Sequence, residues 1–473
     1  MGKSGPDRDQ SIRKRIISSS AGYVFFRTIA GGLGAAATLL LYRLLGPDEA
    51  GRFAVAMALA TTFGSLTGLG FTGTLARFVP EGGPDEGAGL YRRALRFVFI
   101  ALFFGALLFV VFSWLGFGVP AEIRSIVPIV IVAMAAYTLY TTAQGMMQGQ
   151  GRFRLLPRLE FGANFMAKIA ALGVILIIPG YVAAFTARTV VQVLIVGLTF
   201  YILKGALSKP ERRLKSHEAE FTRLVWFGAV ILMLSNTVSL YVIRFMLEPA
   251  DVGIFAAGSR FTVIIEQLVI ASINVPLLFY FSHPESSSMK YAIVQKGTRV
   301  AGSLMGLAAL FLAITAEWIV RLLLGEAYDE SASVARIYAS HALGAALLIF
   351  FVPLSTSENK PQYVITLNFT NFLITLILAL ILVPSYGAIG AAIAGVVAIQ
   401  VVVIGATVFL KHRFGVDVRG IVFRILALYS GCYVLLEWGQ PLLACLVYIA
   451  ALWPLKLLRP GDYDLIKRGR AGG

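Results

Sequence analysis

Residues 45–54 read LGPDEAGRFA, and residues 247–256 read LEPADVGIFA. Leucine, proline, glycine, phenylalanine and alanine coincide in the two stretches, which lie about 200 residues apart. A second pair matches at nearly the same spacing, because residues 179–183 read PGYVA and residues 384–388 read PSYGA. Two matches in the same order predict an internally duplicated chain, with the polar stretch after residue 203 at its seam.

The composition is that of a membrane protein. The 473 residues are 58% hydrophobic and 14% charged, and the mean hydropathy is +0.79, whereas charged residues make up about 25% of soluble domains. Apolar runs long enough to cross about 30 Å of hydrocarbon recur along the chain without period-two alternation. In lipid, only helices or closed barrels satisfy the backbone, so these runs predict an all-α polytopic membrane protein.

Fourteen transmembrane helices are predicted, as six, six and two. The first six lie near residues 18–45, 52–79, 93–117, 123–148, 157–178 and 181–203. The others lie near 222–246, 252–281, 295–324, 334–357, 362–383 and 386–411, with a last pair near 420–437 and 440–458. The predicted parts are an N-lobe six-helix bundle (1–203), a cytoplasmic basic linker (204–222), a C-lobe six-helix bundle (223–411), and an extra helix pair with a cytoplasmic tail (412–473).

Lysine and arginine concentrate in alternate loops, which orients the chain. Cytoplasmic loops retain these residues, so both termini and the linker are predicted to be cytoplasmic in a multi-pass protein of the cell (plasma or inner) membrane. Six helices per repeat give both copies one orientation, with a pseudo-twofold axis along the membrane normal and a cleft between the bundles. The linker's Arg212, Arg213 and Lys215 suggest an amphipathic helix on anionic lipid, or a docking segment for cytoplasmic glycan-assembly enzymes.

Four basic residues fall inside predicted spans. They are Arg27, Lys168, Arg188 and Arg260. A charge at the bilayer centre costs about 2.5–3.5 kcal/mol, so such residues normally face protein or water. Gln267 and Asn274 share the helical face of Arg260. Polar faces of this kind predict a cationic substrate-binding cavity; the alternative, snorkelling to an interface, fits Lys168 best.

Glu266 is the acid that lies well inside these polar spans. One interpretation is a coupling site for H⁺ or Na⁺, or a partner that moves between arginines during transport. The other is a static ion pair with Arg260 or another buried cation. The four histidines lack metal-ligand spacing and no phosphate-cradling loop is present, so no metal, cofactor or catalytic residue is predicted.

Four stretches resemble a known family. They read LGPDEAGRF at residues 45–53, LARFVPE at 75–81, QGQGRF at 148–153 and YGAIGAA at 386–392. In this order, at the ends of these helices, they are similar to the polysaccharide transporter family, the Wzx-type oligosaccharide flippases of the multidrug/oligosaccharidyl-lipid/polysaccharide (MOP) exporter superfamily. Ala50 stands where the family pattern has an aromatic residue.

The resemblance implies a two-lobed flippase rather than an enzyme. Such a protein moves an oligosaccharide linked to polyprenyl or dolichyl (pyro)phosphate from the cytoplasmic to the outer leaflet, with cavity cations holding the phosphate. The expected partners are this lipid-linked oligosaccharide and membrane lipids, and no nucleic acid. A drug or metabolite exporter of the same superfamily and a peptidoglycan-precursor lipid flippase remain alternatives. The last helix pair either forms a groove for the lipid tail or packs on a lobe.

Overall fold

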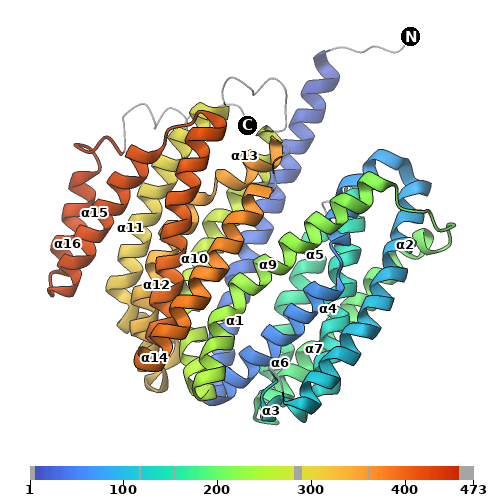
Figure 1. The fold of residues 1–473 in the computed structure, drawn as a ribbon, viewed down its shortest axis with the longest axis horizontal. Helices are drawn as coiled ribbons and strands as arrows, with labels where there is room; N and C mark the ends of the chain where they lie inside the picture. The colour runs from blue at the N-terminus through green and yellow to red at the C-terminus, as the bar shows by residue number, and fades with distance from the viewer. Residues whose placement is uncertain are drawn as a thin grey trace. The chain divides into compact units, whose positions relative to one another are not determined.

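The computed structural model describes residues 6–457, apart from residues 117–118, 153–154, 282–289, 359 and 361. The side chains of residues 6–30, 81–84, 157, 267–281 and 356–357 are also outside the described part. Every regular element in the described part is helical (Figure 1), which confirms the predicted all-α class.

Contacts divide the chain into two units, Met1–Thr237 and Val238–Gly473. The division falls inside the helix Ser216–Met246, beyond the predicted linker of residues 204–222.

The first unit is built from helices joined by short turns. Its elements are α1 (Pro6–Thr67), α2 (Phe71–Leu115), α3 (Ala121–Arg124), α4 (Val127–Gly149), α5 (Leu156–Phe161), the π-helical turn η1 (Gly162–Met166), α6 (Ala167–Ile175), α7 (Tyr181–Ile202), α8 (Lys204–Leu207) and the first part of α9 (Ser216–Met246). The second unit continues α9 and adds α10 (Pro249–Phe281), α11 (Lys290–Leu324), η3 (Glu326–Tyr328), α12 (Asp329–Leu348), α13 (Phe351–Ser357), α14 (Gln362–Phe414), α15 (Arg419–Glu437) and α16 (Pro441–Ala451).

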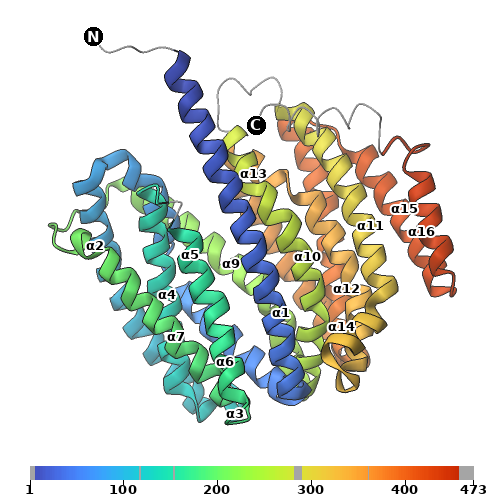
Figure 2. The same cartoon turned by 180° about the vertical axis from the view of Figure 1, so that it is seen from behind.

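Several helices contain more than one predicted span. The chain leaves the helical conformation at Gly46 in α1 (φ 73°, ψ 167°), where it changes direction (Figure 2). It does so again at Gly387 in α14 (φ 58°, ψ −138°). Among the described residues, eight helices are long and apolar enough to cross a membrane, or up to nine if a bent pair counts as one span. The number of helices thus understates the crossings, and each of the fourteen predicted spans overlaps helical residues.

The bent pair interrupts the predicted second span, 52–79. Positive φ angles at Leu69 (50°) and Gly70 (75°) separate α1 from α2, and the two helical segments meet at 48°. The start of α9 fills this break: a Cβ on Gly70 would lie 2.5 Å from the Thr222 carbonyl oxygen. The Trp226 Nε1 also donates to the freed carbonyl of Leu66 at 2.8 Å. The first helix of the second repeat therefore completes the packing of the first unit.

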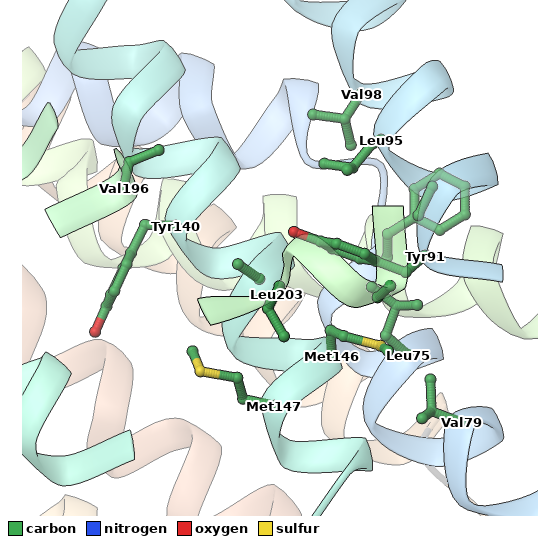
Figure 3. Close-up of a cluster of buried hydrophobic side chains, with 14 of the residues drawn as sticks. Leu75, Val79, Tyr91, Leu95, Val98, Tyr140, Met146, Met147, Val196 and Leu203 are labelled. Atoms are coloured by element: carbon green, nitrogen blue, oxygen red, sulfur yellow. The ribbon is translucent and has the colours of Figure 1, made fainter. Parts of the chain in front are cut away.

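A hydrophobic cluster holds α2, α4 and α7 together (Figure 3). Tyr91 of α2 is fully buried beside Leu75 and Met146. Close approach depends on glycines of α4, because a Cβ on Gly145 or Gly149 would overlap the backbone of α2. Small residues at helix contacts are the usual means of association in lipid, where apolar side chains gain little from leaving the solvent.

The two duplicated motifs bind each other in the first unit. The Glu49 carboxylate, from the first motif, accepts a hydrogen bond of 2.6 Å from the Tyr181 backbone N–H, from the second. Tyr181 is the first residue of α7, so the carboxylate satisfies one unpaired donor and favours the positive end of the helix dipole. Arg52 holds this acid from the other side at 3.4 Å.

The corresponding motifs also meet in the second unit. Asp251 takes the place of Glu49 in the repeated sequence, and a Cβ on Gly387 would lie 3.7 Å from its Oδ1. Gly387 and Tyr386 belong to the second copy of the PGYVA-like motif. The repeated residues are therefore those that join one helical hairpin to another within each unit.

The linker does not form the predicted surface helix. Residues 208–215 are non-helical and lie along α2, where the Arg212 N–H donates to the Gly89 carbonyl at 3.2 Å. Glu211 pairs with Arg93 at 2.8 Å. Arg212 makes a two-pronged ion pair with buried Glu218, at 2.9 and 2.8 Å. The amphipathic-helix prediction was wrong because these charges pair within the protein.

The last helices, α15 and α16, pack on α11 (Figures 1 and 2). The Tyr448 hydroxyl donates to the Ser303 carbonyl at 3.0 Å, and a Cβ on Gly306 would overlap that hydroxyl. Gly306 therefore allows the close helix packing that its spacing from Gly302 predicts. The outward residues of α15 and α16, including Phe423 and Leu442, are exposed apolar side chains. Packing on a lobe is thus observed for this pair.

Candidate functional site

A lysine of the first unit is held between two helices. Lys168 Nζ donates to the Gly34 carbonyl at 2.7 Å, and the Thr38 hydroxyl donates to the same oxygen at 2.9 Å. Gly34 lies twelve residues before the turn at Gly46, about 18 Å along the helix. Lys168 was expected to snorkel to an interface. Instead, its ammonium group joins α6 to the middle of α1.

The geometry of α6 explains this contact. The π-helical turn η1, Gly162–Met166, lies just before Lys168 and shifts the helix register. Such π-turns are frequent at functional sites. Because Gly34 has no side chain, the ammonium group can reach its carbonyl oxygen. A Cβ added at this position would lie 3.2 Å from Nζ, which is tighter than ordinary van der Waals contact.

Arg188 lies on the inward face of α7. Its guanidinium is half-buried and donates to the Oε1 of buried Gln192 at 3.2 Å. Thr199, two turns further on, is fully buried on the same face. The predicted stripe of Arg188, Gln192 and Thr199 thus faces the interior of the first unit.

The second unit contains an acid–imidazole pair. His341 Nδ1 and Glu266 Oε1 lie 2.7 Å apart, and both side chains are 18% exposed. Tyr338 stacks on the imidazole, with ring centroids 4.7 Å apart and an interplanar angle of 6°. The pair joins α10 to α12.

In the described part, Glu266 contacts His341, whereas Arg260 or another buried cation was the expected partner in a static pair. Arg260 lies six residues earlier on α10, about 9 Å along the axis and on a different face. It is half-buried. Sequence reasoning missed His341 because it tested the histidines only for metal-ligand spacing. The useful signal was an ionisable residue within the predicted span 334–357.

The remaining predicted residues lie in helices whose side chains are outside the described part. Arg27 belongs to α1, and Gln267 and Asn274 belong to α10. Among the described residues, no group of three or more histidine, cysteine or acidic side chains could hold a metal ion.

Each unit thus carries ionisable side chains inside predicted spans. The first carries Lys168 and Arg188, and the second carries Arg260 with the Glu266–His341 pair. Fixed cations suit the binding of anionic groups, and the carboxylate–imidazole pair can hold an exchangeable proton.

The fold is shared with membrane transporters of known structure. The Lipid II flippase MurJ in an inward closed conformation aligns with a TM-score of 0.71 at 13% identity, over 93% of this chain and 99% of that one. An inward-facing multidrug resistance MATE family transporter of the MOP superfamily aligns with 0.63 at 14% identity, over 83% and 98%. The Vibrio cholerae MATE transporter VcmN in the bent form aligns with 0.57 at 15% identity, over 87% and 98%.

The described helices indicate an integral membrane protein, and the alignments show that it has the fold of these transporters. The sequence search of curated proteins finds no match. The model of the polysaccharide biosynthesis protein family, Polysacc_synt, matches residues 18–282, more than half of the chain. The chain belongs to this family, as its motifs predict.

Proposed function

We propose that the protein is a flippase for an oligosaccharide linked to a polyprenyl or dolichyl (pyro)phosphate. The cargo moves from the cytoplasmic to the outer leaflet of the cell membrane by alternating access through a cationic central cavity. Family membership and the MurJ-like fold support this class of cargo. Lipid-linked peptidoglycan precursors have the same chemistry, a glycan on a lipid phosphate.

The observation that carries the proposal is the set of cations in the predicted spans, Lys168 and Arg188 in the first unit and Arg260 in the second. The same spans carry two acids, and both have partners: Glu160 accepts from Gln144 at 3.1 Å, and Glu266 contacts His341. Guanidinium groups bind phosphate through two parallel hydrogen bonds, and they stay charged when desolvated. We assign Arg188 and Arg260, with Arg27, Gln267 and Asn274, to the phosphate and glycan contacts.

An exporter of organic cations is the rival function. Its cargo would favour acids in the site, whereas the residues assigned to the site here include three arginines and one acid, Glu266. The alignment with MATE transporters supports a shared fold but does not identify the cargo, so the charges of the site are the basis for choosing between the two functions.

The Glu266–His341 pair is the proposed coupling site. Loss of the contact between Glu266 Oε1 and His341 Nδ1, which joins α10 to α12 at 2.7 Å, would free these two helices from each other. Transport into vesicles should then depend on a proton gradient in the native protein and lose that dependence in Glu266→Gln. Gradient dependence on Na⁺ alone would contradict proton coupling.

Lipid analysis of depleted cells tests the flippase function. Complete lipid-linked glycan should accumulate in the cytoplasmic leaflet, protected from a sugar-cleaving enzyme added outside. Truncated glycans would point to an assembly enzyme, and an unchanged lipid profile would favour the exporter.

Complementation of the depleted cells tests the cationic site. Arg260→Gln should lower transport about tenfold to a hundredfold, because a charge-assisted hydrogen bond contributes about 1.5–3 kcal/mol. Arg413→Gln, at an exposed position at the end of α14, is the matched control and should restore transport. Full activity of Arg260→Gln would remove this residue from the substrate site.

A further inference from the structure

A cavity of about 460 Å³ opens at one end of the second unit, away from the Glu266–His341 pair. It lies where α11 and α15 begin and where the chain leaves α16. Its walls are Gln295, Lys296, Arg299, Asp417, Gly420, Ile421, Arg424 and Lys456.

The walls carry four cations and one acid. That acid, Asp417, is already occupied: it accepts from Arg419 Nε at 3.1 Å and Nη2 at 3.0 Å, and Lys411 Nζ lies 3.5 Å away. The Arg419 hydrogen bonds hold the pKa of the Asp417 carboxyl well below its usual range, so the acid stays charged and paired. The cavity therefore presents a net positive surface.

Two of the cations are fixed before any ligand arrives. Arg424 Nε donates to the Gly420 carbonyl and Nη1 to the Leu455 carbonyl, both at 2.8 Å. Arg299 is only 6% exposed. A buried, positioned guanidinium loses little side-chain entropy on binding an anion, which raises its affinity for phosphate.

The turn after α16 places Lys456 at the cavity. The φ of this residue is +55°, the left-handed conformation of a residue that ends a helix. The Leu457 N–H donates to the Leu452 carbonyl and the Lys456 N–H to the Trp453 carbonyl, both at 2.9 Å. This turn brings Lys456 to the wall formed by Arg424.

We infer that this cavity binds the phosphate group of an anionic bilayer lipid. Its position fits a lipid headgroup, because the outward faces of α15 and α16 below it carry exposed apolar side chains such as Phe423 and Leu446. Basic pockets between transmembrane helices are typical headgroup sites. The bound lipid would fasten the last helix pair to α11, independently of the transported cargo.

Binding to the purified full-length protein tests the inference. Phosphatidylglycerol added to detergent micelles should bind saturably, by native mass spectrometry, and raise the thermal midpoint, whereas phosphatidylcholine should not. Lys296→Gln with Arg424→Gln should weaken phosphatidylglycerol binding by at least about tenfold, since each basic residue near an anionic lipid contributes about a factor of five.

The control removes two charges elsewhere. Arg321→Gln with Arg336→Gln changes residues near the far end of α11, where Arg321 lies about 33 Å along the helix from Arg299, and should leave the affinity unchanged. Lys296→Gln with Lys456→Gln avoids the more buried arginines and should also weaken binding if the first pair fails to fold.

Inorganic phosphate separates the two sources of a phosphate group. Binding of millimolar phosphate that the cavity variants abolish, without saturable binding of phosphatidylglycerol, would overturn the lipid assignment in favour of a soluble ligand. Equal binding of both lipids with no effect of phosphate, or equal losses in the cavity and control variants, would overturn the inference as a whole.

Discussion

Removal of the Glu218 carboxylate should detach the linker from the first unit. Glu218 has a side chain that is 3% exposed and makes three charge-assisted contacts: two with the Arg212 guanidinium and one with the Lys215 backbone N–H at 2.8 Å. The last contact is the reach-back bond of a capping box, since Glu218 is the third residue of α9.

The size of the effect follows from these contacts. Breaking a buried ion pair costs about 3–5 kcal/mol. We expect a cost near the lower limit, because the Arg212 side chain is 18% exposed and can be partly solvated after the pair is broken. A loss of about 3 kcal/mol in a unit of this size corresponds to a thermal midpoint lowered by about 6–12 °C. Glu218→Gln keeps the capping acceptor and one bond to Arg212, so about half this loss is expected.

Thermal unfolding of Glu218→Ala in detergent, followed by tryptophan fluorescence, measures the shift. Glu220→Ala is the matched control, because Glu220 is exposed on the same turn of α9. Limited proteolysis should cut residues 208–215 faster in Glu218→Ala than in the control. A shift no larger than that of Glu220→Ala would refute the assignment of this pair as the anchor of the linker.

Three further predictions concern other contacts. Lys168→Met removes one charge-assisted bond to Gly34, so amide exchange in α6 should rise about tenfold, and unchanged exchange would show that the tie is unimportant. Gly306→Ala should lower the free energy of unfolding by about 1–3 kcal/mol through overpacking. Adding Tyr448→Phe should restore the stability, because the added methyl group overlaps the Tyr448 hydroxyl. A double variant that is no more stable than Gly306→Ala in thermal unfolding would contradict this contact. The hydrogen bond from Arg93 lowers the pKa of Glu211 below its ordinary value of 4.5. The contact of Glu211 with Arg93 should therefore persist above pH 4.5 and be lost only as the pH falls through the lowered pKa. A spin label at residue 209 that becomes mobile above pH 4.5 would contradict this prediction.

The helices were predictable because apolar length is a local property of the chain, and the repeated motifs predict a duplication on the same local grounds. The sequence could not show that Glu49 caps the helix that begins at Tyr181, since that bond joins residues far apart in the chain. Both residues nevertheless belong to the repeated motifs, which marks them as important before any contact is known.

The errors have a common cause. The basic linker was taken as a lipid-binding helix because its composition shows charge, whereas its pairing with Glu211 and Glu218 depends on the position of α2. Lys168 was assigned to the interface because its carbonyl partner, Gly34, lies on another helix. Predictions of free charge fail where tertiary contacts supply the opposite group.

The helix α9 has a consequence for how the chain is made. Its first turns close the break at Gly70, yet they are translated after the linker, as the start of the second repeat. During synthesis on a ribosome, the packing of the first six spans would therefore stay incomplete between Leu66 and Gly70 until Trp226 has emerged. A split version of the protein should accordingly be divided after Met246, and not within residues 208–215, where the predicted duplication has its seam.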